Sequence, residues 1–222
     1  MSSKVVIVDY GLGNIFSINQ ACKHVGLDST ITSDPKHILN ADALILPGVG
    51  AFGDAMNSLR ENNLIEPILD FVKTGKPFLG ICLGMQLLFT ESEEFGEHKG
   101  LNLVPGKIVR FPEFNSNSKV VRVPQIQWNQ IYKNDPLVWN SSPLIDIEEG
   151  TYMHFVHSYY AIPQSNDNIL SYSEYEGVRY ASAVAKDNIV GVQFHPEKSA
   201  DQGLKIYRNW SNYIKNKVYR LC

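Results

Sequence analysis

The sequence of 222 residues has no marked excess of charge of either sign. Lys and Arg total 20 against 23 Asp and Glu, a net charge of −3, so we expect no nucleic-acid partner held by its phosphates. The most apolar run, 78–89, is shorter than the roughly 20 residues that a membrane-spanning helix needs. The N-terminus runs directly into a strand-like Val5–Val8, without a signal-peptide pattern. We therefore expect a cytoplasmic protein with no membrane partner.

Cysteine is scarce, with three in the chain. An odd number without a secretory signal does not predict a disulfide framework. Cys22 falls in the apolar stripe of an amphipathic run and is interpreted as core packing, and Cys222 is the last residue, where chains are commonly mobile. Cys82 alone stands in a context that indicates reactivity.

Metal-ligand spacing is also lacking. His154 and His157 are three apart in a strand-like run, where alternation points them to opposite faces. Residues Gly48–Gly53 match the dinucleotide pattern G-x-G-x-x-G, but they follow the third predicted strand. The acidic residue about 20 positions on, Asp70, lies in a helical pattern rather than at a strand end. The sequence therefore predicts no metal and no cofactor, and leaves this turn as a source of backbone N–H donors.

In the first half of the chain, fully apolar runs alternate with amphipathic ones. Strands are predicted at 5–8, 29–32, 43–46 and 77–81, and helices up to Val25 and over 52–60, 65–73 and 85–89. This alternation predicts an α/β fold with a largely parallel central sheet flanked by helices.

The second half of the chain differs, because strand-like runs follow one another closely. They are 108–111, 120–123, 151–160, 169–175, 179–185 and 189–194, with a polar loop at 113–119. We predict an additional antiparallel or mixed sheet here, within a single domain of residues 1–222. The final segment, 203–220, is basic and aromatic. Its residues Ile206, Trp210, Tyr213 and Ile214 share one helical face, which favours a packing helix over a nucleic-acid-binding one.

Cys82 lies at a predicted strand-to-helix junction, in Gly80-Ile81-Cys82-Leu83-Gly84. This G-x-C-x-G pattern is the cysteine form of a nucleophile elbow, in which glycines permit a sharp, strained turn. The positive end of the following helix favours a thiolate, and the Leu83 N–H is placed to stabilise an oxyanion. The alternative is a buried cysteine between glycines needed only for packing.

A nucleophilic cysteine needs a base, and the base needs an orienting group. Gln193-Phe194-His195-Pro196-Glu197 offers both. Pro196 biases His195 toward an extended conformation, in which residues i and i+2 project to one side. We therefore predict that Glu197 hydrogen-bonds the His195 imidazole.

These motifs, in this order, resemble the class I (triad) glutamine amidotransferase family over nearly the whole chain. The shared pieces are Pro47-Gly48-x-Gly50, Gly80-x-Cys82-x-Gly84-x-Gln86 and His195-Pro196-Glu197. Tyr10–Asn14, Pro47-Gly48-Val49-Gly50 and Glu197–Ser199 resemble in particular the glutaminase subunits of imidazole glycerol phosphate synthases.

The resemblance implies that Cys82 attacks the side-chain amide of glutamine, that His195 transfers the protons, and that Glu197 holds the imidazole. It further implies an oxyanion site made by Leu83 and the Gly48, Val49, Gly50 turn, and glutamine-holding positions at Gln86, Ser158 and Tyr159. Reorientation of one peptide in that turn would switch the oxyanion site. The implied partner is a (β/α)₈-barrel cyclase subunit that forms a heterodimer and receives the ammonia in histidine biosynthesis.

One segment departs from the family pattern. Where the family has Val-Pro-His-x-Gly-Trp-Asn, residues 123–129 carry Gln125 and Gln127 in place of the histidine and the glycine. This segment faces the synthase in the family, and extra residues occur near 113–118 and 134–147. A paralogue serving another synthase, such as a surface-polysaccharide sugar amidotransferase, therefore stays open. Two alternatives of other classes are a non-catalytic docking subunit and a protease-type or chaperone-type cysteine hydrolase.

Overall fold

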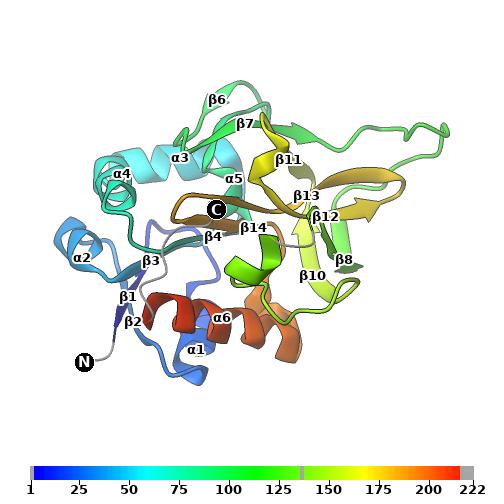
Figure 1. The fold of residues 1–222 in the computed structure, drawn as a ribbon. Coiled ribbons are helices and arrows are strands. Elements are labelled where there is room, and N and C mark those ends of the chain that lie inside the picture. The colour runs from blue at the N-terminus through cyan, green and yellow to red at the C-terminus, as the bar shows by residue number, and fades with distance from the viewer. Residues whose placement is uncertain (1–2, 136–137, 216–222) are drawn as a thin grey trace.

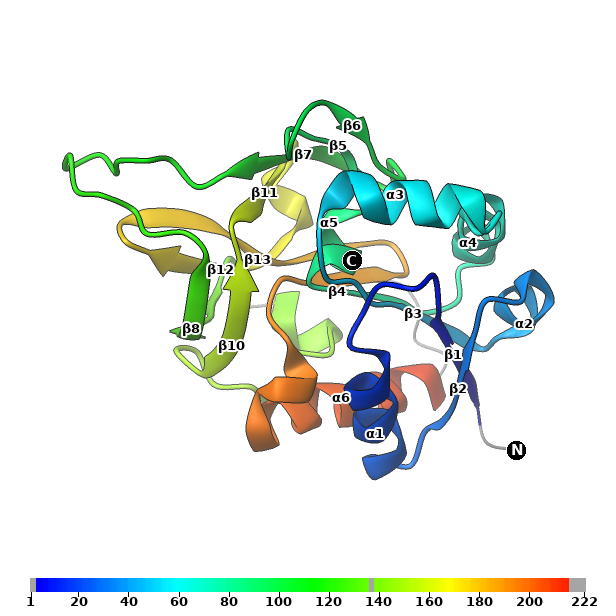
Figure 2. The same cartoon turned by 180° about the vertical axis from the view of Figure 1, so that it is seen from behind.

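The computed structural model describes residues 3–135 and 138–215. One part of its main sheet is parallel, with helices on both faces (Figures 1 and 2). Its strands, in spatial order, are β2 (Asp28–Thr32), β1 (Lys4–Val8), β3 (Ala43–Leu46), β4 (Phe78–Ile81) and β14 (Ile189–Val192). Helices α1 (Ile15–His24) and α6 (Ala200–Lys215) cover one face, and α3 (Phe52–Glu61) and α4 (Ile65–Lys73) cover the other.

The central strands are apolar at almost every position because both faces of the sheet are covered. In β1, Val5 and Ile7 join the core that contains the buried residues of α1 and α6, whereas Val6 and Val8 join the core that contains those of α3 and α4. The predicted parallel sheet flanked by helices is confirmed.

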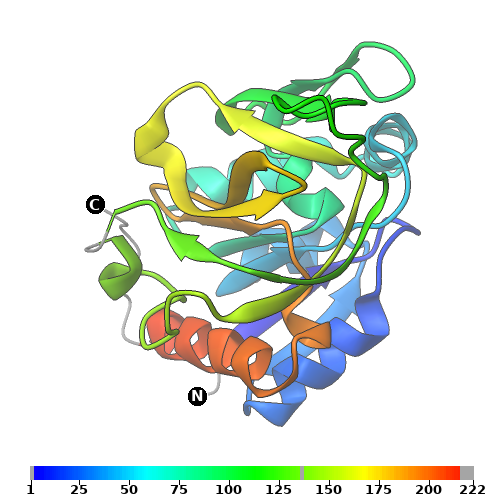
Figure 3. The same cartoon turned by 90° about the vertical axis from the view of Figure 1, so that its right-hand side faces the viewer.

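Beyond β14 the same sheet continues with mostly antiparallel pairs. The order is β13 (Val178–Lys186), β11 (Tyr159–Pro163), β7 (Val104–Arg110), β5 (Phe89–Ser92) and β6 (His98–Lys99), while β12 (Ile169–Tyr175) pairs with β13 and with β9 (Tyr132–Lys133). A separate antiparallel pair, β8 (Gln125–Gln130) with β10 (Tyr152–His157), lies on the α6 side of the main sheet (Figures 1 and 3). The predicted second-half sheet is thus confirmed as an extension of the main sheet together with this pair.

Three predicted elements are wrong in detail. The 120–123 segment is no strand: Val121 is buried and Val120 makes an isolated bridge, so its apolar pattern reflects packing, and the strand β8 begins only at Gln125. The predicted helix at 85–89 is displaced, because α5 (Leu83–Gln86) starts directly at the elbow and Phe89 already belongs to β5. The predicted strand 151–160 is two strands, which are separated at Ser158.

One helix was missed, and its start signals could have revealed it. Helix α2 (Pro35–Asn40) is capped by Asp34, whose Oδ1 accepts from the Lys36 N–H at 2.8 Å. Asp at the N-cap followed by Pro at the first helical position is a common helix start. Three 3₁₀ helices complete the described chain: η1 (Val138–Ser141), η2 (Asn166–Asn168) and η3 (Pro196–Lys198).

The C-terminal helix is a packing helix, as predicted. The four residues of its predicted apolar face, Ile206, Trp210, Tyr213 and Ile214, are all buried. Cys22 is likewise fully buried, so its assignment to the core is confirmed. The last part of the predicted helix, 216–220, and Cys222 lie outside the described residues. Across residues 3–135 and 138–215, no helix is long and apolar enough to cross a membrane.

Candidate active site

The strand-to-helix turn at Cys82 is as sharp as the sequence predicted. Cys82 has φ 54° and ψ −114°, a left-handed conformation that is uncommon for a residue with a side chain. A Cβ at Gly84 would lie 1.9 Å from the Leu46 carbonyl oxygen, and one at Gly80 would lie 2.9 Å from the Gly84 oxygen. Both glycines are therefore required sterically for the turn that presents Cys82.

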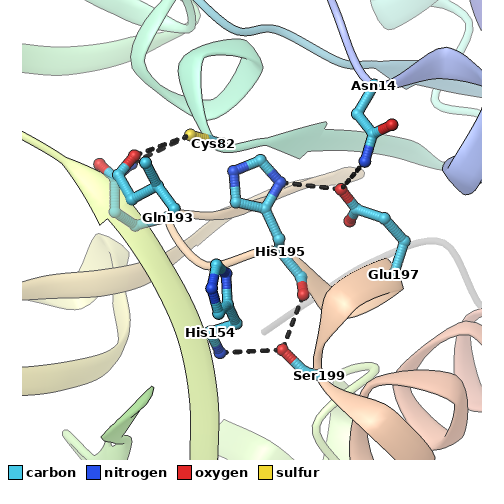
Figure 4. A network of polar contacts seen from close by, with 8 residues as sticks. Asn14, Cys82, His154, Gln193, His195, Glu197 and Ser199 are labelled. Carbon is cyan, nitrogen blue, oxygen red and sulfur yellow. Dashed lines mark hydrogen bonds and ion pairs between the residues drawn. The ribbon is translucent and has the colours of Figure 1, made fainter. Parts of the chain in front are cut away.

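Strand pairing brings the histidine to the cysteine. β14 lies parallel to β4 with Val192 opposite Ile81, and the Cys82 N–H donates to the Val192 oxygen at 2.8 Å. The chain that leaves β14 therefore passes Cys82, and the His195 imidazole lies between the side chains of Cys82 and Glu197 (Figure 4).

Glu197 contacts the imidazole, as predicted, but the backbone conformation that brings it there is not the predicted extended one. Its Oε1 lies 2.8 Å from His195 Nδ1, and both side chains are almost fully buried. His195 is extended, as predicted, whereas residues 196–198 form the 3₁₀ turn η3. The carboxylate therefore reaches the ring because the chain turns back, and not because two extended residues share a side.

The electrostatic environment favours an imidazolium at His195. Burial alone would lower its pKa, but the charge of Cys82 and hydrogen bonds to Cys82 and Glu197 raise that pKa to about 10. Asn14, from the Tyr10–Asn14 motif, adds a longer contact of 3.4 Å from its Nδ2 to Glu197 Oε1. His195 can therefore donate a proton near neutral pH.

A cavity of about 270 Å³ opens beside Cys82 and His195. Eight of the ten predicted site residues line it: Val49, Gly50, Cys82, Leu83, Gln86, Ser158, Tyr159 and His195. The other two lie behind its wall. Glu197 stands behind His195, and Gly48 packs against the elbow, where a Cβ would come within 2.8 Å of Leu83 Cβ.

Gln86 and Gln193 brace this wall. The Gln86 Nε2 donates to Gln193 Oε1 and to the Tyr159 oxygen, both at 2.9 Å. Gln193 Nε2 in turn lies 3.8 Å from the Cys82 sulfur (Figure 4). Gln193 was not predicted from the sequence, although its place two residues before His195, on the extension of β14, was an available signal.

Two charged residues of the cavity were also missed. Glu94 receives the Phe52 N–H on Oε2 at 2.7 Å, and burial raises its pKa. In sequence it belongs to the acidic run Glu91–Glu94, which is typical of a solvated loop. Lys198 follows the predicted motif directly and also lines the cavity.

The two unusual glutamines have different positions. Gln125 is fully buried and accepts from the Tyr180 hydroxyl at 3.0 Å, whereas Gln127 is exposed. Gln125 pairs in register with His157, which precedes Ser158 of the cavity wall. Of the two departures from the family pattern, only Gln127 can alter the surface, and Gln125 alters the support of the wall.

His157 itself is a buried neutral histidine. Its Nδ1 lies 2.8 Å from the Tyr159 carbonyl oxygen, which only accepts, so Nδ1 carries the proton. Burial lowers its pKa to about 4. In the part of the chain that the structure describes, no group of three His, Cys, Asp or Glu side chains could hold a metal ion.

A cysteine at a nucleophile elbow, with a buried histidine and glutamate beside it, is the arrangement of a hydrolase with a cysteine nucleophile. Sequence comparison places the chain in a family of this kind. The family described as glutamine amidotransferase class-I matches residues 6–211, and the chain belongs to this family. It is 45% identical over 94% of its length to the imidazole glycerol phosphate synthase subunit HisH of Syntrophotalea carbinolica, and covers 99% of that protein. It is 47% identical over 94% of its length to the HisH subunit of Sulfurimonas denitrificans, and covers 98% of it.

Solved structures show the same fold at lower sequence identity. PurLQS from Thermotoga maritima superposes with a TM-score of 0.72 at 19% identity, covering 96% of this chain and 100% of that one. A glutamine amidotransferase from the same organism gives a TM-score of 0.60 at 16% identity, covering 98% of this chain and 86% of that one.

Proposed function

We propose that this chain is the glutaminase subunit of a cytoplasmic imidazole glycerol phosphate synthase. It hydrolyses glutamine to glutamate and ammonia and passes the ammonia to a (β/α)₈-barrel cyclase subunit, its partner in a heterodimer, for histidine biosynthesis. The observation that carries the proposal is the Cys82, His195 and Glu197 arrangement beside a cavity of about 270 Å³. The near full-length similarity to HisH subunits supports the particular pathway.

The chemistry follows from the buried imidazolium. The Cys82 sulfur, as thiolate, attacks the side-chain amide carbon of glutamine, and His195 gives its proton to the nitrogen as the C–N bond breaks. Ammonia leaves and a γ-glutamyl thioester remains on Cys82. His195 then takes a proton from water, which attacks the thioester; glutamate leaves, and the thiolate and imidazolium are restored.

The oxyanion is stabilised by backbone donors from two segments that line the cavity with Cys82. Leu83 is the first residue of α5, ahead of the first helical donors, Met85 and Gln86, whose N–H groups bond the Cys82 oxygen. The Val49–Gly50 turn lines the same cavity. Loss of one such donor costs about 3–4 kcal/mol of transition-state stabilisation.

The cavity offers groups for both ends of glutamine. Glu94 provides a carboxylate for the α-ammonium group, and its Oε2 is fixed by the Phe52 N–H at the start of α3. Ser158 and Tyr159, which line the same cavity, provide the polar groups that orient the rest of the substrate. Gln86 keeps that wall in place through the Tyr159 oxygen.

The synthase partner docks on the exposed side of β8 and β10. Ile126 is 62% exposed and Trp128 is 47% exposed, and Tyr152 lies nearby on the paired strand. The same surface borders the cavity through Pro124 and Val156. Apolar side chains grouped around an active-site opening are typical of a protein-binding surface.

The test is glutamine hydrolysis by the purified chain, alone and with a histidine-pathway cyclase partner plus its nucleotide ligand. We expect strong stimulation by the cyclase, lost in Cys82→Ala and kept in Cys22→Ala, which removes a buried core thiol. Absence of stimulation, with the cyclase active on free ammonia, would contradict the pathway and point to another synthase. Full activity of Cys82→Ala would contradict the chemistry.

A further inference from the structure

The catalytic loop and the small β8–β10 sheet are joined by an unusual set of hydrogen bonds. The His195 N–H donates to the His154 oxygen on β10 at 2.9 Å. The His154 N–H donates to the Ser199 hydroxyl at 3.0 Å, and that hydroxyl donates to the His195 oxygen at 2.7 Å (Figure 4). Ser199 is 1% exposed.

These three hydrogen bonds resemble those of two paired residues in an antiparallel sheet, except that a hydroxyl group bridges one of the two N–H···O contacts. Two directly opposed residues of an antiparallel ladder exchange two N–H···O bonds. His195 and His154 make the first bond directly, and the Ser199 hydroxyl is inserted into the second. The catalytic histidine is thereby held to β10 as if it were a residue of a third strand in that sheet.

The Ser199 hydroxyl is itself placed by its surroundings. Its own N–H donates to the Pro196 oxygen at 3.0 Å, and its carbonyl accepts from the Gly203 N–H in the first turn of α6. A Cβ at Gly203 would lie 1.9 Å from the Pro196 oxygen, so α6 begins in close contact with η3. The position of the hydroxyl is therefore restricted. Its two hydrogen bonds fix the distance between the main chain of β10 and that of His195.

β10 also forms part of the rest of the site. The Val156 oxygen lies 3.8 Å from the Cys82 sulfur, and Ser158 follows the end of the strand. On the exposed side, the Trp128 ring packs edge-on against the His154 ring, with 5.9 Å between centroids. One strand thus contacts the nucleophile, the substrate wall, the histidine and the proposed docking surface.

We propose that Ser199 is a positioning residue that fixes the main chain of His195 against β10. It sets the separation between the histidine and Cys82, and it transmits the docking of a partner on β8 and β10 to the catalytic loop. The second role rests on the proposed function, whereas the first does not.

The test uses Ser199→Ala, with Ser171→Ala as the matched control. Ser171 is also a buried serine whose hydroxyl contacts another side chain, Ser182 Oγ at 2.9 Å, but it does not touch the catalytic loop. With the cyclase partner bound, we expect kcat for glutamine to fall about 10- to 100-fold in Ser199→Ala, with KM changed less than about 3-fold, because small misplacements of catalytic groups cost rate. Ser171→Ala should keep its kcat.

Two measurements on the isolated chain need neither partner nor turnover. In Ser199→Ala, the amide of His154 should exchange with deuterium faster. Reaction of Cys82 with iodoacetamide at pH 7 should also be slower, since a displaced imidazolium supports the thiolate less.

Unchanged exchange and alkylation in Ser199→Ala would overturn the positioning role, as would equal losses of kcat in both variants. If the wild-type chain hydrolyses no glutamine with any partner, the proposed function fails, and the exchange and alkylation results still decide the role of Ser199.

Discussion

Glu197 shows how a single buried charge shapes the candidate site. Its side chain is 0% exposed, and Oε1 lies within hydrogen-bond distance of His195 Nδ1 and of Asn14 Nδ2. Glu197→Gln keeps the shape and an acceptor but removes the charge that helps to raise the pKa of His195. We expect kcat to fall on the order of 10²- to 10⁴-fold, as for other triads that lose the orienting carboxylate.

The dependence of glutaminase activity on pH shows in which direction the substitution shifts the pKa of His195. With a lower His195 pKa, the imidazolium of Glu197→Gln is lost at lower pH, so its activity should decline earlier on the alkaline side. Glu66→Gln, at an exposed position on α4, is the control. An unchanged profile in Glu197→Gln would contradict the assigned role.

His157 makes a separate prediction about stability. Its pKa is about 4 in the folded chain because of burial, against about 6.5 when unfolded, so the unfolded state binds this proton first as the pH falls. The stabilising effect of the neutral ring is complete above pH 6.5 and is lost toward pH 4, a change of about 3 kcal/mol. His157→Asn keeps a donor to the Tyr159 oxygen but does not titrate.

Urea unfolding at pH 7 and pH 4 measures this effect. The decrease in the free energy of unfolding between the two pH values should be smaller in His157→Asn than in wild type by about that amount. Equal decreases would show that His157 is not the titrating group.

At the scale of residues, the sequence predicted the residues of the proposed catalytic motif better than it predicted the residues that surround them. Cys82 and Leu83 could be assigned because adjacent residues of one motif fix their geometry. Glu94 could not, since a carboxylate in an acidic run gains its role only from the start of a helix distant in sequence, where it accepts the Phe52 N–H. Gln193 lay within reach through its place two residues before His195, but its contact with Gln86 depends on the fold.

At the scale of elements, Gly84 and Gly53 differ in whether a side chain could be accommodated at their positions. A Cβ at Gly84 would lie 1.9 Å from backbone, the Leu46 oxygen, whereas one at Gly53 would meet the partly exposed His98 ring at 2.6 Å. A ring can rotate away, and alanine gains helix propensity of about 1 kcal/mol over glycine within α3. We expect Gly53→Ala to change the free energy of unfolding by less than about 1 kcal/mol.

Gly84→Ala should instead cost about 3 kcal/mol or more, because the elbow cannot close against β3 without backbone displacement. Thermal unfolding of both variants measures the difference. A loss of stability in Gly53→Ala as large as in Gly84→Ala would contradict the steric difference between the two positions.

The elements that sequence reasoning located well were those with a strong pattern of their own. The central parallel strands β1, β3, β4 and β14 were found because burial on both faces makes them almost uniformly apolar, and α6 was found because one of its faces is apolar. The pair β8 and β10 was not resolved, since Gln125–Gln130 is polar throughout apart from Ile126 and Trp128, and its pairing comes from a segment more than twenty residues later.

At the scale of the whole molecule, the site lies where the two kinds of sheet meet. The parallel part supplies Cys82 from the end of β4 and the turn after β3. The antiparallel part supplies Tyr159, the first residue of β11, and Ser158 directly before it. β14 belongs to both, because it pairs parallel with β4 and antiparallel with β13, and the histidine follows it. No local pattern could have predicted this meeting, which depends on inserting a strand from near the C-terminus beside β4.

On the proposed docking surface of β8 and β10, Trp128 tests the whole arrangement. Trp128 is 47% exposed and its ring packs against that of His154, whose backbone is hydrogen-bonded to His195 and Ser199. In Trp128→Ala, binding of the cyclase partner should weaken by about 2 kcal/mol or more, roughly 30-fold in Kd, as expected for an aromatic residue at an interface centre. Titration calorimetry measures Kd, with Phe16→Ala, an aromatic that is 68% exposed on α1, as the control. If both variants bind equally well, the synthase docks elsewhere, and the route from β8 through β10 to His195 is not the one that the partner uses.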